Sequence, residues 1–138
     1  MLILKTDITP LPAKILARKD EIAINFVHLA EQHIADLMSC NATKRFHATD
    51  FASILFIHPR HLTTTLRLAI NTSVCDYMEE RILAEAQKLL KETNLSVAEI
   101  GQRFAYSEAT NFTKFFKGMT GVTPFEYRKS LKAEGLRE

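Results

Sequence analysis

Two stretches of the chain carry hydrogen-bond donors at the spacing of one face of a helix. Arginine and lysine can donate to the O6 and N7 atoms of guanine or to phosphate. Threonine offers a hydroxyl group, and a methyl group that packs on the methyl group of thymine. The first face consists of Arg60, Thr63, Thr64 and Arg67, and the second of Ala109, Thr110, Thr113, Lys114 and Lys117. Faces of this kind suit the grooves and backbone of double-stranded DNA.

The chemistry of these side chains divides them by role. Arg60 can form two hydrogen bonds to a guanine, and Lys114 can donate to the same atoms, so both are candidates for reading bases. Arg67 and Lys117 lie at the far ends of the two faces, where we expect contact with phosphate. Such contact positions a protein on DNA but carries no sequence information. On an unrelated helical bundle the same residues would be ordinary solvated surface.

The two faces belong to an internal repeat with an offset of 50 residues. The first copy contains RHLTTTLRLAINTSVCDYMEER, and the second contains EATNFTKFFKGMTGVTPFEYR. Aligning Phe112 with Leu62 also aligns Gly121 with Asn71, and both of these residues tolerate the left-handed backbone that ends a helix. The apolar residues that we expect to pack inward are Leu62, Leu66 and Ile70 in the first copy, and Phe112, Phe115 and Phe116 in the second.

Helical periodicity and turn residues predict an all-α protein of about seven helices. The expected helices are 19–40, 48–55, 59–70, 73–93, 97–104, 108–119 and 124–133. Each copy is then a short helix, a tight turn and a longer helix, which is the helix-turn-helix pattern. In that pattern the second helix enters the major groove, so the recognition helices would be those at about 59–70 and 108–119.

The domain organisation follows from the repeat. We expect an N-terminal arm or linker over 1–18, where Pro10 and Pro12 interrupt the periodicity. A first helix-turn-helix subdomain with the connector helix should cover 19–93, and a second should cover 94–138. A connector of about 20 residues spans roughly 30 Å, close to the spacing of about 34 Å between successive major grooves.

Residues at the predicted helix starts support these limits. His58 occupies the cap position before a proline, and Ser96 with Glu99 forms the pattern of a capping box. Thr123 is a cap residue before another proline. The backbone N–H groups at the helix starts near Ser96 and Thr123 can also hold phosphate. Gly101 is expected at a close crossing of two helices.

The chain has 138 residues, of which 46% are hydrophobic and 25% are charged, and this composition is typical of a compact globular protein. The net charge is only +2, but residues 44–75 carry +3 and residues 103–132 carry +4, whereas 76–99 carry −3. Two basic segments flanking an acidic connector suit a polyanion contacted at two places. There is no long apolar run and no signal peptide pattern, and Cys40 and Cys75 are expected to be reduced thiols of a cytoplasmic protein.

Four sequence segments carry a family resemblance. They are AYS at 105–107, FTKFFK at 112–117, GVTPFEYR at 121–128 and RILAEAQKLL at 81–90. In order and spacing they closely resemble the DNA-binding domain of the AraC/XylS family of bacterial transcription regulators, whose last motif reads G-x-[ST]-P-x-x-[YF]-R. The resemblance covers about 21–131. It implies a tandem helix-turn-helix fold, sequence-specific binding of double-stranded DNA, and DNA contacts at the two faces described above.

The chain departs from the family pattern at several positions. Ala105 stands where the family has glycine in the turn, Asn71 replaces glycine in the first copy, and His58 replaces a serine cap. The first recognition helix carries Thr63-Thr64-Thr65, where relatives often have glutamine or arginine. Whether this helix reads bases therefore stays open.

Other classes of function find less support in the residues. His58 and His61 lie near one helical face, but two ligands do not complete a zinc site, and no motif of an enzyme appears. We expect no metal, no cofactor and no catalysis. A helical protein-interaction module that has lost specific DNA binding is the alternative.

Partners and control are less determined by the residues. RNA polymerase is a candidate partner of a transcription regulator. Residues 1–18 are too few for an effector or dimerisation domain. Either such a domain is absent from this chain and belongs to a longer protein, or the regulator is governed by its abundance.

Overall fold

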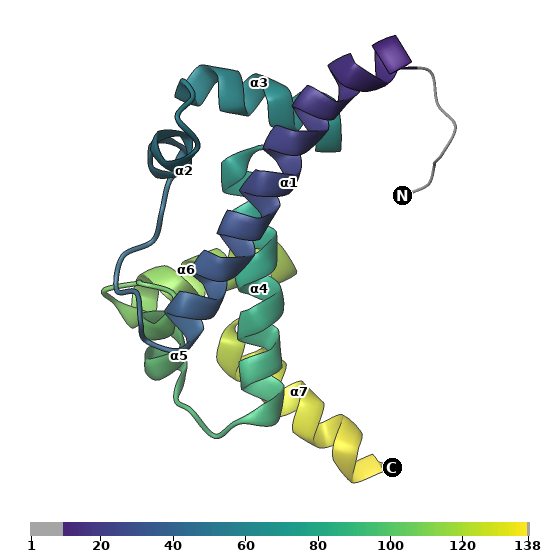
Figure 1. Ribbon diagram of the computed structural model, residues 1–138. Coiled ribbons are helices and arrows are strands. Elements are labelled where there is room, and N and C mark those ends of the chain that lie inside the picture. The colour runs from purple at the N-terminus through teal and green to yellow at the C-terminus, as the bar shows by residue number, and fades with distance from the viewer. Residues whose placement is uncertain (1–9, 138) are drawn as a thin grey trace. The chain divides into compact units, whose positions relative to one another are not determined.

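The computed structural model describes residues 10–137, with side chains described for 18–135. Within that range every regular element is a helix, which confirms the all-α prediction (Figure 1). The helices are α1 (Pro10–Met38), α2 (Ala48–Leu55), α3 (Pro59–Ile70), α4 (Val74–Glu92), α5 (Val97–Arg103), α6 (Ala109–Thr120) and α7 (Pro124–Arg137). The predicted limits of α2 and α3 are confirmed to the residue. Those of α4, α5 and α6 differ by one residue at one or both ends, and α7 runs beyond the predicted 133.

The start of α1 corrects the sequence analysis. The expected helix start at 19 was wrong, because the helix already begins at Pro10. The remainder of the proposed arm, residues 1–9, lies outside the described residues. Pro10 and Pro12 fall in the first turn of α1. Proline is tolerated there because the first N–H groups of a helix have no partner within the helix.

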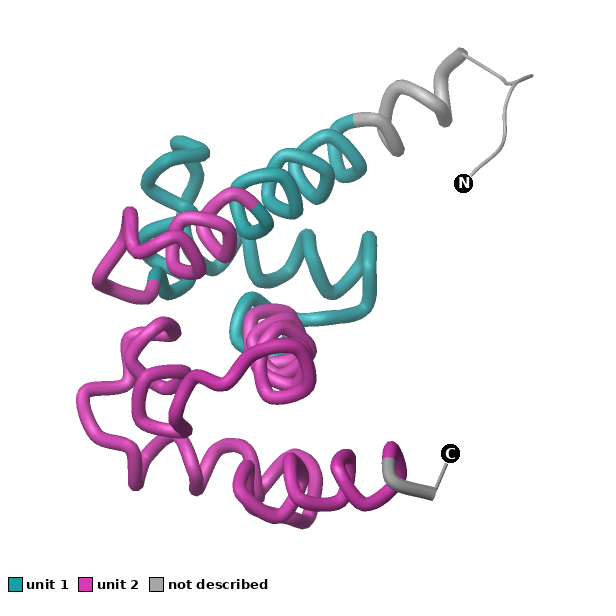
Figure 2. Tube along the Cα trace, turned by 90° about the horizontal axis from the view of Figure 1, so that it is seen from below, with its two compact units in different colours: residues 1–31, 46–76 teal, residues 32–45, 77–138 magenta. Residues whose placement is uncertain are grey.

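The chain forms two compact units, each containing one helix-turn-helix (Figure 2). Within the described residues, the first unit comprises 10–31 together with 46–76, and so holds α2 and α3. The second comprises 32–45 and everything from 77 onward, and so holds α5, α6 and α7. The expected limits of 19–93 and 94–138 grouped the connector helix with the first copy, whereas most of α4 belongs to the second unit. The reason lies in the core of that unit.

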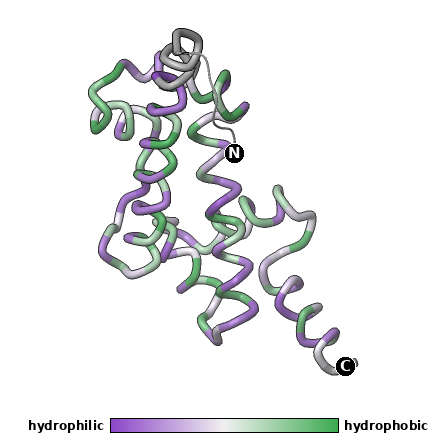
Figure 3. The backbone as a smooth tube through the Cα atoms, turned by 45° about the vertical axis from the view of Figure 1, so that its right-hand side comes forward, coloured by the Kyte–Doolittle hydropathy of each residue, from purple (hydrophilic) through white to green (hydrophobic). Residues whose placement is uncertain are grey.

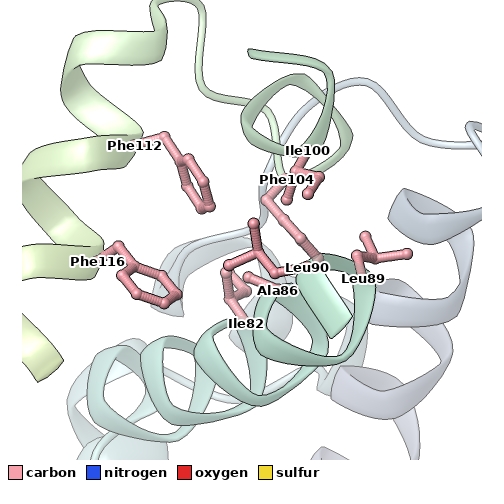
Figure 4. Close-up of a cluster of buried hydrophobic side chains, with 8 residues drawn as sticks. All are labelled: Ile82, Ala86, Leu89, Leu90, Ile100, Phe104, Phe112 and Phe116. Atoms are coloured by element: carbon pink, nitrogen blue, oxygen red, sulfur yellow. The ribbon is translucent and has the colours of Figure 1, made fainter. Parts of the chain in front are cut away.

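The core of the second unit joins three helices. Its buried members are Ile82, Ala86, Leu89 and Leu90 of α4, Ile100 of α5, Phe104 just after it, and Phe112 and Phe116 of α6 (Figure 4). The two phenylalanines of α6 point from one side towards the apolar face of α4. Burying each such side chain contributes about 1.5–3 kcal/mol, so this cluster fixes the orientation of α6.

The core of the first unit is smaller and again centred on aromatic rings. Phe51 of α2 meets Phe26 of α1 edge to face, with ring centroids 5.2 Å apart, and meets Phe46 in the same manner at 5.5 Å. Leu62 and Leu66 of α3 are fully buried, as predicted. Ile70, the third residue expected inward, is instead 40% exposed at the last position of α3.

One arginine links α7 to the end of α4 within the second unit. The guanidinium of Arg128 in α7 donates to the carbonyl oxygens of Leu90 at 3.0 Å, Thr93 at 3.2 Å and Leu95 at 2.7 Å. The last carbonyl groups of a helix have no partner within the helix, so a charged donor from α7 satisfies them. Arg128 thereby joins α7 to the connector and to the loop that leads into α5.

Polar and apolar residues alternate along the described helices rather than forming long apolar runs (Figure 3). None of these helices combines the length and hydropathy that a membrane span requires. Many of their apolar side chains are instead buried in the two cores.

Substitution of Arg128 tests its role in stability. Arg128→Met should lower the free energy of unfolding by about 3 kcal/mol, because three carbonyl groups lose a charged donor. Urea unfolding of the whole chain, followed by circular dichroism, measures this as a lower midpoint at unchanged slope. The exposed neighbour offers the control, since Lys129→Met should change stability by less than about 0.5 kcal/mol. Equal midpoints for the two variants would contradict the assignment.

Candidate nucleic-acid interface

The positioning helix of the second unit starts with a closed capping box. The N–H of Ser96 donates to Glu99 Oε1 at 2.8 Å, and the N–H of Glu99 donates to Ser96 Oγ at 3.1 Å, which confirms the predicted box. The backbone hydrogen bond from Ser96 lowers the pKa of the Glu99 carboxyl, with the hydroxyl of Ser96 as the next contribution. The start of α5 is therefore held by an ionised carboxylate of the chain itself.

Helix α7 starts in the same way. The N–H of Thr123 donates to Glu126 Oε1 at 2.9 Å, and the N–H of Glu126 donates to Thr123 Oγ1 at 3.1 Å. Hydrogen bonds from Thr123 likewise lower the pKa of the Glu126 carboxyl, the backbone bond most. The N–H groups of Ser96 and Thr123 are thus engaged by glutamates, which removes these two groups from the donors expected to hold phosphate.

The turn into α3 is built from an aromatic residue and a histidine. Phe56 follows α2 with a left-handed backbone (φ 59°), and its ring is 94% exposed. His58 then caps α3, because its Nδ1 accepts a hydrogen bond from the N–H of Arg60 at 3.0 Å. The predicted cap role of His58 is confirmed. At the other end Asn71 is left-handed (φ 53°), and its N–H donates to the carbonyl of Arg67, which ends the helix as expected.

The turn into α6 is held by packing on its tyrosine. Ala105, at the position where the family has glycine, adopts a left-handed backbone (φ 68°). Tyr106 then stacks on Phe115 with centroids 5.8 Å apart and contacts Phe112 at 5.6 Å. The guanidinium of Arg45, from the loop before α2, lies 4.7 Å from the centre of the tyrosine ring. Alanine thus adopts here a positive φ that glycine reaches without steric cost.

Helices α5 and α6 cross at Gly101. A Cβ atom placed on this residue would lie 2.9 Å from Cβ of Phe112, closer than real Cβ atoms approach one another. The predicted close crossing is confirmed. Because both neighbours sit on helical backbone, the absence of a side chain at Gly101 sets how α6 leans against α5.

The residues predicted to contact DNA lie on the outer faces of α3 and α6. In α3 the four predicted residues are all exposed. In α6 four of the five are exposed, and Thr113 is half-buried. The exposed ones are Arg60, Thr63, Thr64, Arg67, Ala109, Thr110, Lys114 and Lys117. The α3 residues therefore lie in the first compact unit, and the α6 residues lie in the second.

Two exposed polar residues on the recognition helices were not among the predicted DNA contacts. His61 in α3 and Asn111 in α6 occupy the same place in the repeat, with the same offset of 50 residues, and both are exposed. The asparagine carboxamide can form two hydrogen bonds to adenine, which suits a base-reading position. The repeat alignment was the signal that could have found them.

A metal site is not assembled in the described part of the chain. No group of three or more histidine, cysteine, aspartate or glutamate side chains comes together there in a way that could hold a metal ion. His58 and His61 are accordingly assigned to the cap and to the exposed edge of α3.

Comparison with known proteins gives the same class of domain. Residues 51–130 match a family model described as a helix-turn-helix domain. The chain is 31% identical over 90 residues to the HTH-type transcriptional activator AarP of Providencia stuartii, which covers 65% of this chain and 67% of AarP. It is 28% identical over 104 residues to the arabinose operon regulatory protein of Escherichia coli, covering 75% of this chain but only 35% of that protein.

A solved structure agrees with these relatives. The C-terminal domain of AraT, a response regulator from Geobacillus stearothermophilus, superposes with a TM-score of 0.66 at 26% identity, covering 76% of this chain and 84% of that domain. The match thus spans about a third of the arabinose regulator but most of the C-terminal domain of AraT.

The Gly101 crossing makes a prediction about stability. Gly101→Ala should lower the free energy of unfolding by about 1–3 kcal/mol, since the new methyl group overlaps Phe112. The gain in helix propensity of about 0.5–1 kcal/mol only partly offsets this. Gly118→Ala in α6 is the matched control, because open space surrounds that position, and it should stabilise by up to about 1 kcal/mol. Thermal unfolding of both variants measures the difference in stability. If Gly101→Ala is as stable as Gly118→Ala, the close approach of Phe112 to Gly101 is contradicted.

Proposed function

The chain belongs to the AraC/XylS family of helix-turn-helix transcription regulators, which makes it a sequence-specific DNA-binding unit, and from this premise we propose how it reads DNA. Helices α3 and α6 enter successive major grooves of one duplex. One chain thereby does what a dimer of single helix-turn-helix proteins does. The observation that carries the proposal is the pair of exposed polar faces, one on the recognition helix of each unit.

The length of the connector supports two grooves on one side of the duplex. Helix α4 has 19 residues. At about 1.5 Å per residue it spans roughly 28 Å, which is comparable with the spacing of about 34 Å between half-sites one helical turn apart. The connector is acidic, whereas the segments that carry α3 and α6 are basic, so the positive charge is concentrated at the two proposed contacts.

The roles of the side chains follow their chemistry. Arg60 and Lys114 read bases, because each is exposed near the start or centre of its recognition helix and donates to guanine. Arg67 and Lys117 hold phosphate from the far ends of the helices. The exposed Asn111 joins the base-reading group.

The wider role of the protein goes beyond this domain. Since the chain spans 35% of the arabinose regulator, control by an effector or dimerisation domain absent from this chain is part of the proposal. Contact with RNA polymerase is also part of the proposal. The proposal also includes a cytoplasmic location and the absence of catalytic activity.

A second function is favoured by one observation. The outer part of α3 also exposes apolar side chains, with Leu68 64% exposed, which suits a helical protein-interaction module that has lost specific DNA binding. Salt dependence separates the two functions, because DNA binding through phosphate contacts weakens steeply with salt, with a log–log slope of about −0.9 per contact.

Selection of bound duplexes from a random library, at near-physiological salt, tests the proposal directly. Two enriched blocks whose centres lie about one helical turn of DNA apart are expected, one for each recognition helix. One block beside a featureless stretch would show that a single helix reads bases. No enrichment together with a flat salt dependence would favour the interaction module.

The division of roles in α6 gives a sharper prediction. Lys114→Ala should lower affinity for the selected duplex roughly tenfold more than affinity for a random duplex, because it removes a base contact. Lys117→Ala should weaken both duplexes by the same factor and reduce the salt slope by about 0.9. Fluorescence anisotropy titrations at several salt concentrations measure both effects, with the exposed Lys132→Ala in α7 as control. Equal losses of affinity on both duplexes for both variants would contradict the assignment of Lys114 to bases and Lys117 to phosphate.

A further inference from the structure

The hydroxyl group of Thr63 is already committed within the protein. Its Oγ1 donates to the carbonyl oxygen of Pro59, four residues earlier in α3, at 3.1 Å. A threonine hydroxyl carries one proton, so this bond uses the only one it can donate. The bond also directs the oxygen back towards the helix axis, which leaves the methyl group as the part of this exposed side chain that faces outward.

The surface of α3 next to Thr63 carries further exposed methyl groups. Thr64 is exposed beside Thr63, and Leu68 follows Thr64 by one helical turn with 64% of its surface exposed. Arg60 lies one helical turn before Thr64, and Arg67 directly precedes Leu68, and both arginines are exposed. The exposed face of α3 therefore combines two guanidinium groups with methyl groups.

The equivalent face of α6 is built differently. At the place of Thr64 the second copy has Lys114, and at the place of Leu68 it has Gly118. Both are exposed, so α6 offers an ammonium group and bare backbone where α3 offers methyl groups. The two recognition helices therefore differ in the chemistry that they can recognise, although their folds repeat.

We propose that α3 recognises thymine through its C5-methyl groups, with Thr63 as the specificity-determining residue. The inference rests on the proposed function and deepens it for one of the two helices. In the major groove only thymine carries a methyl group, and apolar contact with threonine methyl groups is a recognised way to read it. Thr63 selects thymine by its shape and contact surface, and the arginines supply the attraction to phosphate or guanine.

Reading by the hydroxyl group is the competing role for Thr63. To donate to a base or to phosphate, the hydroxyl would have to give up its bond to Pro59, whereas the methyl contact leaves that bond in place. The two roles predict opposite behaviour for variants that keep one group and remove the other.

The experiment removes the methyl group from the DNA. In the selected duplex, the thymines of the block read by α3 are replaced one at a time by deoxyuridine, which pairs identically but has no C5-methyl group. Binding of the whole chain is then measured by fluorescence anisotropy. At the contacted thymine the Kd should rise about fourfold, which corresponds to about 0.8 kcal/mol for one methyl group. The same replacement in the block read by α6 is the control, and a smaller change is expected there.

Two variants of the protein identify the residue. Thr63→Ser keeps the hydroxyl and removes the methyl group, so it should bind the thymine duplex about as weakly as the unchanged protein binds deoxyuridine, and should no longer distinguish the two duplexes. Thr63→Val keeps a methyl group in place and removes the hydroxyl, so it should keep the discrimination. Thr113→Ser, at the same place of the repeat in α6, should keep the discrimination between thymine and deoxyuridine in the block read by α3, whatever its effect on overall affinity.

The outcomes separate this inference from the proposed function. If the selected duplex has two blocks but deoxyuridine changes nothing, or if the α3 block contains no thymine, the methyl contact is wrong while DNA reading by two helices stands. If Thr63→Val loses the discrimination and Thr63→Ser retains it, the hydroxyl is the reading group and the inference is overturned. If no duplex is enriched at all, the proposed function fails first, and the inference fails with it.

Discussion

A recognition helix can offer side chains to a partner only if its opposite face is held without freedom. Both units meet this constraint with fully buried side chains on one face of the longer helix. In α6 these are Phe112 and Phe116, and in α3 they are Leu62 and Leu66. Because protein interiors are close-packed, a helix whose apolar face is completely buried has few ways to rotate or slide. Gly101 strengthens this in the second unit, because its missing side chain lets the side chain of Phe112 in α6 pack directly against the backbone of α5.

The ends of the helices are fixed as well, by capping interactions and left-handed residues. Capping boxes start α5 and α7, the His58 side chain starts α3, and left-handed residues stop α3 and α6. Each device satisfies backbone groups that the helix itself leaves without partners. The outer faces of α3 and α6 therefore begin and end at defined residues. Defined limits matter for recognition because a helix of different length would present its donors at a different depth in the groove.

The two copies of the repeat differ at positions that the helix-turn-helix fold does not require to be the same. Arg128 joins α7 to the end of the connector in the second copy, whereas the aligned residue of the first copy is Met78, which is buried and apolar. The outward faces differ too, with lysines on α6 and methyl-bearing residues beside the arginines on α3. Shared positions preserve the helix-turn-helix, while the differences give each unit its own supports and its own contact chemistry.

The sequence by itself determined the all-helical class, the repeat, the limits of α2 and α3, the buried phenylalanines of α6 and the caps at His58 and Ser96. These depend on interactions between residues close along the chain, or on apolar spacing, and both can be followed in one dimension. The resemblance to a known family then supplied the positions of the contact faces.

Tertiary structure decided the features that depend on residues far apart in the chain. It placed most of α4 in the second unit, because Ile82 and Leu90 pack with α6. It joined Arg128 to carbonyl groups more than thirty residues earlier. It also showed Ile70 exposed, and showed that the hydroxyl of Thr63 is engaged within α3, although spacing alone treats every threonine alike. The physical reason is that burial and hydrogen-bond pairing are properties of neighbours in space, and a sequence states only neighbours along the chain.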